Sequence, residues 1–288
     1  MKKFKRFTSI SAALVLGVTL LTACGTKDSN TGASPTPTEG DNGLVEIVVG
    51  ANIEPHASIL NSEAVKKSLE ADGFSIKVVE FTDYIQPNVA TSDGSLDANF
   101  FQHIPYLDEY NEKNKTVLKA VANIHFEPLG IYAGKSDSIE NIPDGGQIAV
   151  PNDATNEARA LLLLEKAGLI TLEDNIGLDA TIKNIASNPK NLKIIEVEAA
   201  QTAKSLKDVD LAVINGNYAL TEGLSASEDG LLVEDTNSEA ATTYPNIIVV
   251  NEGNEEIDKT KALIKAVTSD ETRKFIEENW KGAVVPVF

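Results

Sequence analysis

Short β-branched segments alternate with amphipathic helical patterns in two places along this chain, and this alternation narrows the possible folds more than any other feature. The first unit has an expected strand at 44–50, a helix at about 58–71 and a strand at 75–80. The second has a strand at 147–150, a helix at about 156–167 and a strand at 192–197. Each unit reads as βαβ, for which parallel pairing with a right-handed crossover is usual. The sequence therefore predicts an α/β protein with two lobes.

The end of the chain predicts how the lobes connect. Residues 246–250 read as another strand, followed by covering helices at about 255–280. If this strand rejoins the first lobe, the chain crosses between lobes near 134–139 and again near 240–244, and two crossings make a hinge. We therefore expect lobe 1 to comprise 44–136 and 244–288, and lobe 2 to comprise 137–243.

Each expected lobe also contains a similar short passage, in which a strand ends in polar residues and runs into a short helix. The passage Leu96-Asp97-Ala98-Asn99 has a looser counterpart in Val209-Asp210-Leu211-Ala212. This weak repeat points to two facing strand ends, which is the usual ligand position in open α/β sheets. A ligand cleft between the lobes is the expected arrangement.

The start of the chain predicts export and a lipid anchor. Lys2, Lys3, Lys5 and Arg6 precede an apolar run at 10–21, the layout of a secretory signal peptide. Leu21 stands three places before Cys24, as in the lipobox of bacterial lipoproteins. We expect 1–23 to be cleaved and Cys24 to be lipidated. The alternative is an ordinary signal peptide with an incidental cysteine.

The stretch after the cysteine predicts a tether. Residues 25–43 contain no large apolar side chain and many Gly, Ser, Thr, Pro and Asp residues, so 24–43 should be a lipidated, disordered linker. One acyl chain holds a protein only marginally, whereas the two chains of a diacylglyceryl group anchor it stably. The expected location is the extracytoplasmic face of a bacterial cell membrane.

Composition excludes several classes of function. The formal net charge of −18 would repel nucleic acid. The chain has no G-x-S-x-G or G-x-G-x-x-G motif, so we expect no enzyme and no cofactor. His56, His103 and His125 are too scattered to predict a metal site. A metal site assembled from distant residues and a surface adhesin without a small ligand remain alternatives.

Arg159 invites an explanation, because the chain holds only three arginines. Asn156 and Arg159 are three residues apart at an expected helix start and so share a face. A planar guanidinium beside helix N-terminal N–H groups suits a carboxylate ligand. Spacing alone favours the alternative, an exposed arginine paired with a neighbouring acid.

Aromatic and polar residues gather at 99–106, preceded by Tyr84. Alternation along a strand would place Asn99, Phe101 and His103 on one side. At a strand end, such residues suit a pocket for an apolar, polarisable side chain. Core packing is the alternative for these aromatics.

Five motifs, in order along the chain, carry a family resemblance. They are FTDYIQPN at 81–88, FFQHIPYLDEY at 100–110, AVPNDATNEARALLLLEKAGLI at 149–170, NPKNLKIIEVEA at 188–199 and AVIN at 212–215. On these motifs the chain resembles, from about Val45 to Gly282, the methionine-binding lipoproteins of ATP-driven (ABC) methionine importers.

The resemblance implies a two-lobed, type II-like periplasmic-binding-protein fold that closes on L-methionine and delivers it to a permease and, through it, an ATPase. It implies that Tyr84, Phe101, His103 and Tyr106 surround the thioether side chain. It further implies that Arg159 binds the carboxylate, and that Asn156, Asn215 and Asn246 bind the polar groups of the zwitterion. Tyr218 and Tyr244 are weaker candidates.

One departure from the family pattern bears on the ligand. Gly216-Asn217-Tyr218 places an extra asparagine near the expected site. A methionine derivative, a methionine-containing dipeptide or another apolar amino acid are therefore the alternative ligands.

Overall fold

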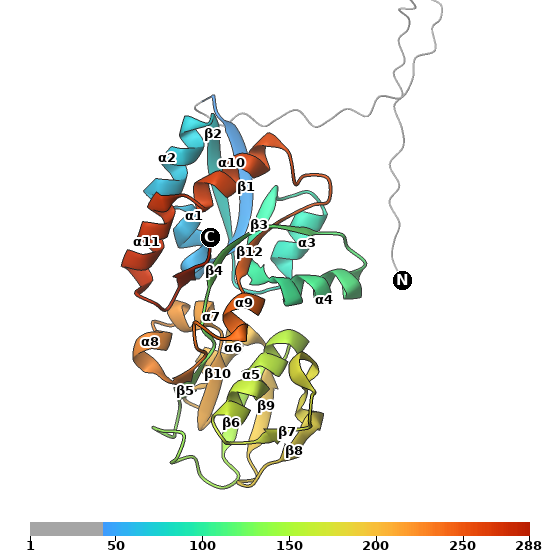
Figure 1. The fold of residues 1–288 in the computed structure, drawn as a ribbon, viewed down its shortest axis with the longest axis vertical. Coiled ribbons are helices and arrows are strands. Elements are labelled where there is room, and N and C mark those ends of the chain that lie inside the picture. The colour runs from blue at the N-terminus through green and yellow to red at the C-terminus, as the bar shows by residue number, and fades with distance from the viewer. Residues whose placement is uncertain (1–42) are drawn as a thin grey trace, which may run out of the picture. The chain divides into compact units, whose positions relative to one another are not determined.

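A computed structural model describes residues 43–288, all of which lie within one compact unit of the chain. The expected signal peptide, Cys24 and all but the last residue of the expected tether lie outside the described residues. Within 43–288, no helix has the length and apolar character needed to cross a membrane. Two separate main sheets organise this part of the chain, as Figure 1 shows.

The first sheet has six strands in the order β13-β4-β12-β3-β1-β2. Their bounds are β1 (Val45–Asn52), β2 (Phe74–Phe81), β3 (Ala98–His103), β4 (Lys119–Phe126), β12 (Asn246–Val250) and β13 (Val285–Pro286). Strand β1 pairs in parallel with β2 and β3, whereas β12 lies antiparallel between β3 and β4. The final strand expected at 246–250 therefore does rejoin the first sheet.

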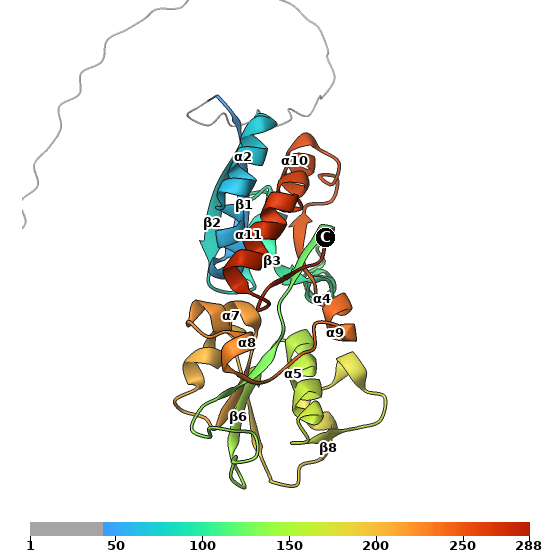
Figure 2. The same ribbon diagram turned by 60° about the vertical axis from the view of Figure 1, so that its left-hand side comes forward.

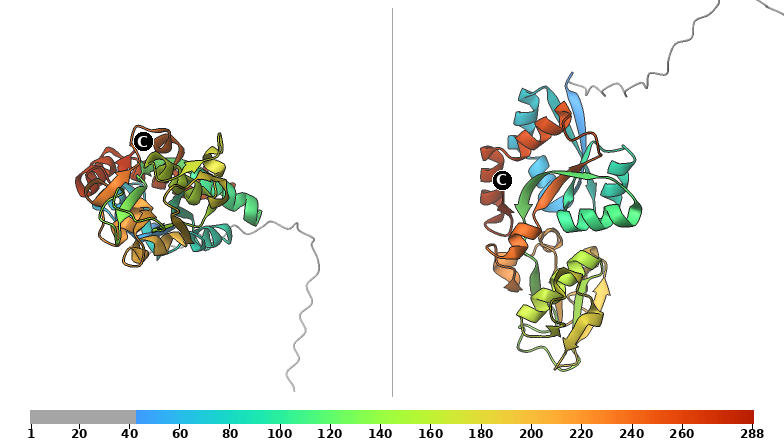
Figure 3. Two further views of the ribbon diagram at one scale, coloured as in Figure 1. Left: turned by 90° about the horizontal axis from the view of Figure 1, so that it is seen from below. Right: turned by 45° about the vertical axis from the view of Figure 1, so that its right-hand side comes forward.

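Helices cover both faces of this sheet. They are α1 (Ser58–Leu60), α2 (Glu63–Ala71), α3 (Gln86–Ser92), α4 (Ile104–Asn114), α10 (Asp258–Val267) and α11 (Asp270–Trp280). Figure 2 shows α2, α10 and α11 together on one side, and the right-hand view of Figure 3 shows α3 and α4, in teal and green, on the other. Alternation along β12 explains how one strand serves both layers, since Ile248 packs toward α2 and α10 while Ile247 packs toward α4.

One expected helix in this lobe is divided. The pattern at 58–71 forms α1 and α2, because Ser62 adopts an extended backbone and accepts a hydrogen bond from the Val65 N–H at 3.3 Å. Ser62 is thus the N-cap of α2.

The second sheet has five strands in the order β11-β5-β10-β6-β9. Their bounds are β5 (Gly130–Ala133), β6 (Gln147–Pro151), β9 (Lys193–Val197), β10 (Leu211–Ile214) and β11 (Gly230–Val233). The helices of this lobe are α5 (Ala154–Lys166), α6 (Ala199–Thr202), α7 (Gly216–Thr221) and α8 (Ala226–Asp229). The central strands β9, β6 and β10 are parallel, as expected from the second βαβ unit. Strands β7 (Thr171–Leu172) and β8 (Ile185–Ser187) form a separate small pair.

The chain passes between the sheets in two places, and the first differs from the expected one. Strand β4 ends at Phe126 and β5, which pairs with β10 and β11, starts at Gly130. The first crossing is therefore 127–129, before the expected 134–139, and 130–136 lies with the second sheet. The expectation failed because Leu129 and Ile131 are buried in the second core, a property that the short apolar run does not reveal. The second crossing, 234–245, contains α9 (Glu239–Thr243) and includes the expected 240–244.

The weak sequence repeat corresponds to the same pair of hydrogen bonds in each sheet, between an aspartate and the neighbouring strand. The Val48 N–H donates to Asp97 Oδ2 at 2.7 Å, and the Asp97 N–H donates to Val48 O at 2.8 Å. The Gln147 N–H donates to Asp210 Oδ2 at 2.7 Å, and the Asp210 N–H donates to Gln147 O at 2.8 Å. Each aspartate thus ties the start of one strand to its parallel neighbour.

We predict that Asp97→Ala and Asp210→Ala each lower the free energy of unfolding by about 1–3 kcal/mol, because each leaves a strand N–H without its acceptor. Urea denaturation measures the change. Asp72→Ala is the matched control, since Asp72 pairs with the exposed Lys265 and such pairs contribute at most about 1 kcal/mol. Equal effects of all three substitutions would contradict the prediction.

Candidate functional site

All eight residues proposed from the sequence line one small cavity where the two lobes meet. They are Tyr84, Phe101, His103, Tyr106, Asn156, Arg159, Asn215 and Asn246. Gln102, Glu127, Gly216 and Asn217 complete the lining and were not proposed. The cavity has a volume of about 20 Å³, which is room for about one water molecule.

The ends of strands and the starts of helices deliver these side chains. In the first lobe, His103 is the last residue of β3 and the N-cap of α4, and Asn246 begins β12. In the second lobe, Asn156 and Arg159 lie in the first turns of α5, and Asn215 follows β10 as the N-cap of α7. Apart from Asn246, these positions follow the carboxyl ends of parallel strands, where open α/β sheets bind ligands.

Strand β3 does not follow the simple alternation expected for it. The pairing of β3 with β12 shifts between Ile247 and Ile248, so that Phe101 has no direct partner. As a result the Gln102 side chain donates to Asn99 Oδ1 at 2.9 Å, although strict alternation would put these residues on opposite faces. Asn99 therefore lies in a buried amide cluster with Gln102, while Phe101 and His103 line the cavity.

Aromatic rings form one wall of the cavity and join the lobes. The Tyr84 ring lies 5.7 Å from Phe101, 5.8 Å from Tyr106 and 5.0 Å from Tyr218, measured between centroids. The Tyr84 hydroxyl donates to Asn217 Oδ1 at 2.6 Å, a bond between the two lobes. Tyr218, a weaker candidate, packs against Tyr84 but does not itself line the cavity.

A chain of side-chain hydrogen bonds, each with a defined direction, fixes which amide atom of the second lobe faces the cavity. Asp153 can only accept when ionised, and Asn156 Nδ2 donates to its Oδ1 at 2.8 Å. Asn156 Oδ1 then accepts from Asn215 Nδ2 at 2.8 Å. This leaves Asn215 Oδ1 buried with no hydrogen-bond partner among the described residues. The cavity therefore contains an oriented acceptor that suits a donor from a ligand.

The tautomer of His103 follows from its two hydrogen bonds. The Tyr106 N–H donates to His103 Nδ1 at 3.2 Å, so the proton of the neutral ring is on Nε2, which donates to Asn156 Oδ1 at 3.3 Å. Burial, with the nearby Arg159 charge, lowers the pKa of His103 to about 3. His103 is thus a neutral donor that supports the amide chain.

Arg159 is buried rather than exposed, and its acidic partner is distant in sequence. Its Nε donates to Glu234 Oε1 at 2.7 Å and its Nη2 donates to Glu234 Oε2 and to Glu127 O. Burial alone would lower the pKa of Arg159, but the Glu234 charge and hydrogen bonds outweigh it and raise the pKa. The guanidinium also lies 4.5 Å from the Tyr244 ring centroid, which gives Tyr244 a supporting position.

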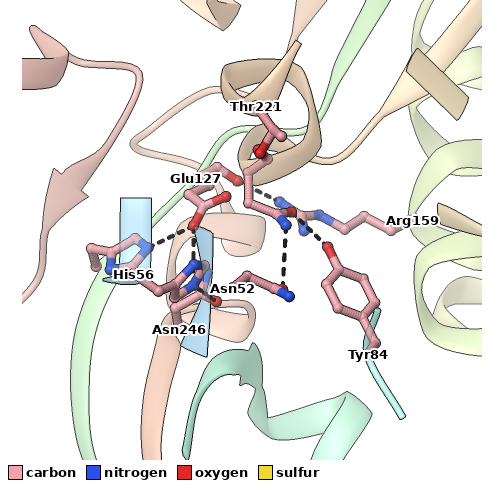
Figure 4. Close-up of polar contacts among 9 residues, drawn as sticks. Asn52, His56, Tyr84, Glu127, Arg159, Thr221 and Asn246 are labelled. Carbon is pink, nitrogen blue, oxygen red and sulfur yellow. Dashed lines mark hydrogen bonds and ion pairs between the residues drawn. The ribbon is translucent and has the colours of Figure 1, made fainter. Parts of the chain in front are cut away.

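Glu127 is the main residue that the sequence analysis missed. Its Oε1 lies 2.6 Å from His125 Nε2 and 3.4 Å from His56 Nε2, and all three side chains are buried. Figure 4 shows Glu127 between His56 and Arg159. The histidines that seem scattered in the sequence therefore include two that share one carboxylate. Burial raises the pKa of Glu127, and the nearby His56 and Arg159 side chains oppose this rise.

Gly216 is needed for close approach between the lobes. A Cβ atom at this position would lie 2.7 Å from Glu127 Cβ, closer than real contacts allow. The first turn of α7 can therefore lie directly against the first crossing. The sequence signal for Gly216 was its place directly after AVIN, whereas none of the motifs includes Glu127.

The paired sheets, the two crossings and the cavity between the lobes define a periplasmic substrate-binding type of protein. Residues 47–288 match the family described as NlpA lipoprotein, and the chain belongs to that family. It is 38% identical over 285 residues to the D-methionine-binding lipoprotein MetQ of Escherichia coli strain K12, an alignment that covers 98% of each chain.

Solved structures agree with this assignment. Lipoprotein Tp32 from Treponema pallidum matches with a TM-score of 0.78 at 40% identity, over 84% of this chain and 99% of that one. A nutrient binding protein from Burkholderia cenocepacia bound to methionine matches with a TM-score of 0.79 at 41% identity, over 84% of this chain and 100% of that one. The two-lobed binding-protein fold predicted from the sequence is confirmed.

We predict that acid destabilises the protein between about pH 6.5 and 4. Burial lowers the pKa of His56 to about 4 and of His103 and His125 to about 3, so the unfolded chain binds more protons in this window. Each histidine should lower the free energy of unfolding by about 2 kcal/mol at pH 5 relative to pH 7.5. Burial raises the pKa of Glu127, Asp153 and Glu157, which acts in the opposite direction.

Urea denaturation at pH 7.5 and pH 5 measures this loss. The chain has only these three histidines, so His103→Gln should remove about a third of the histidine contribution. An unfolding free energy that stays constant from pH 7.5 to pH 5 would contradict the prediction.

Proposed function

We propose that this protein is an extracytoplasmic receptor that captures methionine between its lobes and delivers it to an ABC importer, without catalysing a reaction. The observation that carries the proposal is the charge pattern of the cavity. Among the described residues that line it, Arg159 is the one guanidinium and Glu127 the one carboxylate. A buried zwitterion needs both of its charges paired, and this cavity offers one partner for each. The names of the relatives support methionine as the amino acid.

The ligand carboxylate would bind the free edge of Arg159. A guanidinium carries five N–H groups, and protein partners take three of them in the described part of the chain. The ligand ammonium would bind Glu127 and the unpartnered Asn215 Oδ1. Asn246 also lines the cavity and would bind a polar group of the ligand.

The thioether would lie among Tyr84, Phe101, His103 and Tyr106. Sulfur against aromatic rings contributes only about 0.3–1.5 kcal/mol per contact. Selectivity for methionine therefore depends mostly on the shape and dryness of the aromatic wall.

Binding requires the cavity to enlarge, because room for one water molecule is far below the roughly 300–1,000 Å³ of ligand sites. The crossings at 127–129 and 234–245 are the places where the lobes can move apart. Opening would break bonds between lobes, such as the one from Tyr84 to Asn217. Ligand contacts made with both lobes would then favour the closed form by their differential affinity.

The remaining parts of the proposal concern partners and location. The closed form would dock on a permease that is driven by an ATPase. Lipidation of Cys24, after removal of 1–23, would hold the body at the extracytoplasmic face of the membrane through the 24–43 tether. The moving bodies would be 43–126 with 246–288, and 130–233.

We predict that methionine raises the midpoint of thermal unfolding by about 5–10 °C at one hundred times its dissociation constant. Ligand at that level adds about 2.7 kcal/mol, and a body of this size shifts by about 2–4 °C per kcal/mol. The test compares L-methionine, D-methionine, a methionine-containing dipeptide, other apolar amino acids and divalent metals, using protein refolded to remove bound ligand. A shift with a different ligand would retain the class and change the substrate, and no shift with any would overturn the proposal.

We predict that Arg159→Met combined with Glu234→Gln weakens methionine binding at least about a hundredfold, because the ligand carboxylate loses its charged partner. Arg159→Ala alone is a poorer test, since it would leave Glu234 buried without a counter-charge at a cost of about 3–5 kcal/mol. Titration calorimetry measures the affinity. Arg273→Met is the matched control, because Arg273 stacks on Phe288 away from the cavity. Undiminished affinity in the double variant would refute the role of Arg159.

A further inference from the structure

His56, His125 and Glu127 form a buried cluster at the base of the cavity that the proposed function does not yet explain. The two histidines come from different elements, His56 from the turn after β1 and His125 from the end of β4. Their ring centroids are 5.0 Å apart, and both side chains are fully buried. Of these three residues, Glu127 alone lines the cavity. Asn246, which is hydrogen-bonded to His56, lines it as well.

The cluster has the composition of a metal site, but its geometry favours hydrogen bonds. Each of the three residues offers one atom that could bind a metal ion, and these three atoms lie within 4.8 Å of one another. The 2.6 Å separation of His125 Nε2 and Glu127 Oε1 is that of a direct hydrogen bond. A histidine that binds metal normally donates its other N–H to a partner, and His125 Nδ1 has none among the described residues. With Nδ1 unprotonated, the proton is on Nε2 and points at Glu127.

We propose that His125 and His56 are positioning residues that donate their Nε2 protons to Glu127 and Asn246, and so restrict the site to ligands with a protonated amino group. This inference rests on the proposed function. His125 holds the Glu127 carboxylate, and His56 Nε2 donates to Asn246 Oδ1 at 2.9 Å. Because Asn246 Oδ1 is occupied in this way, its NH₂ group is the part left to act as a donor.

The remaining capacity of Glu127 makes this role possible. A carboxylate has about four lone-pair positions. His125 and the Asn217 N–H occupy two of them, with His56 close to a third. One position is left for the ligand ammonium. Without the histidine donors, a buried carboxylate would take up a proton and lose its attraction for that cation.

The test compares methionine with 4-(methylthio)butanoate, which is methionine without its amino group. In the unaltered protein methionine should bind far more tightly than this analogue. His125→Phe should reduce that preference by about tenfold or more, in line with loss of one hydrogen bond to a charged group. His125→Gln, whose amide can replace the Nε2 donor, should retain it. Melting temperatures check that each variant is folded.

A second measurement needs no variant. Nitrogen-15 NMR of the histidine rings should show His56 and His125 as neutral, Nε2-protonated tautomers at pH 7.5. Nδ1-protonated rings, or an unchanged ligand preference in folded His125→Phe, would overturn the proposal while leaving methionine binding intact. Thermal stabilisation by Zn²⁺ in the unaltered protein that is lost in His125→Phe would also overturn it, by showing a metal site. Failure of the unaltered protein to bind methionine would instead refute the proposed function.

Discussion

The buried ion pair between Arg159 and Glu234 is the interaction on which the site depends. It joins α5 of the second lobe to the second crossing, and Arg159 also donates to Glu127 O in the first crossing. Glu234 in turn accepts from the Leu129 N–H at 2.9 Å. One guanidinium is therefore bonded to both connections between the lobes. Because an unpaired buried charge is costly, this pair holds the crossings beside the cavity.

The polar side chains around the cavity are oriented from its edges inward. Asp153 sets the direction of Asn156 and Asn215 on one side, and the two buried histidines set the direction of Glu127 and Asn246 on the other. The first orientation begins at an ionised carboxylate, which can only accept, and the second at the proposed Nε2-protonated histidines, so neither needs a ligand to form. Preorganisation of this kind reduces the cost of ordering the site when a ligand binds.

Much of the fold could be predicted because hydrophobic periodicity reports strands and helices directly. The strand at 246–250 matches β12, and both βαβ units are present. The first crossing could not be placed, because short apolar runs do not state which sheet they join. Spacing alone left Arg159 as an exposed residue, and the motif resemblance was needed to place it in a site. Glu234 was missed because its partner Arg159 lies far away in sequence. Glu127 was missed because its contacts with His56 and Gly216 join segments that are far apart in sequence.

The two crossings are unequal, and this has a consequence for motion. The first is only the segment 127–129, whereas the second, 234–245, is long enough to contain α9. Each sheet is tied internally by its aspartate, Asp97 or Asp210, on residues outside the cavity lining. The lobes should then rotate as rigid bodies about the short crossing, and the longer crossing should adjust its conformation to follow this rotation. Glu127 belongs to the short crossing. A ligand bound by its carboxylate would therefore contact the hinge itself, rather than the outer edges of the lobes that move farthest.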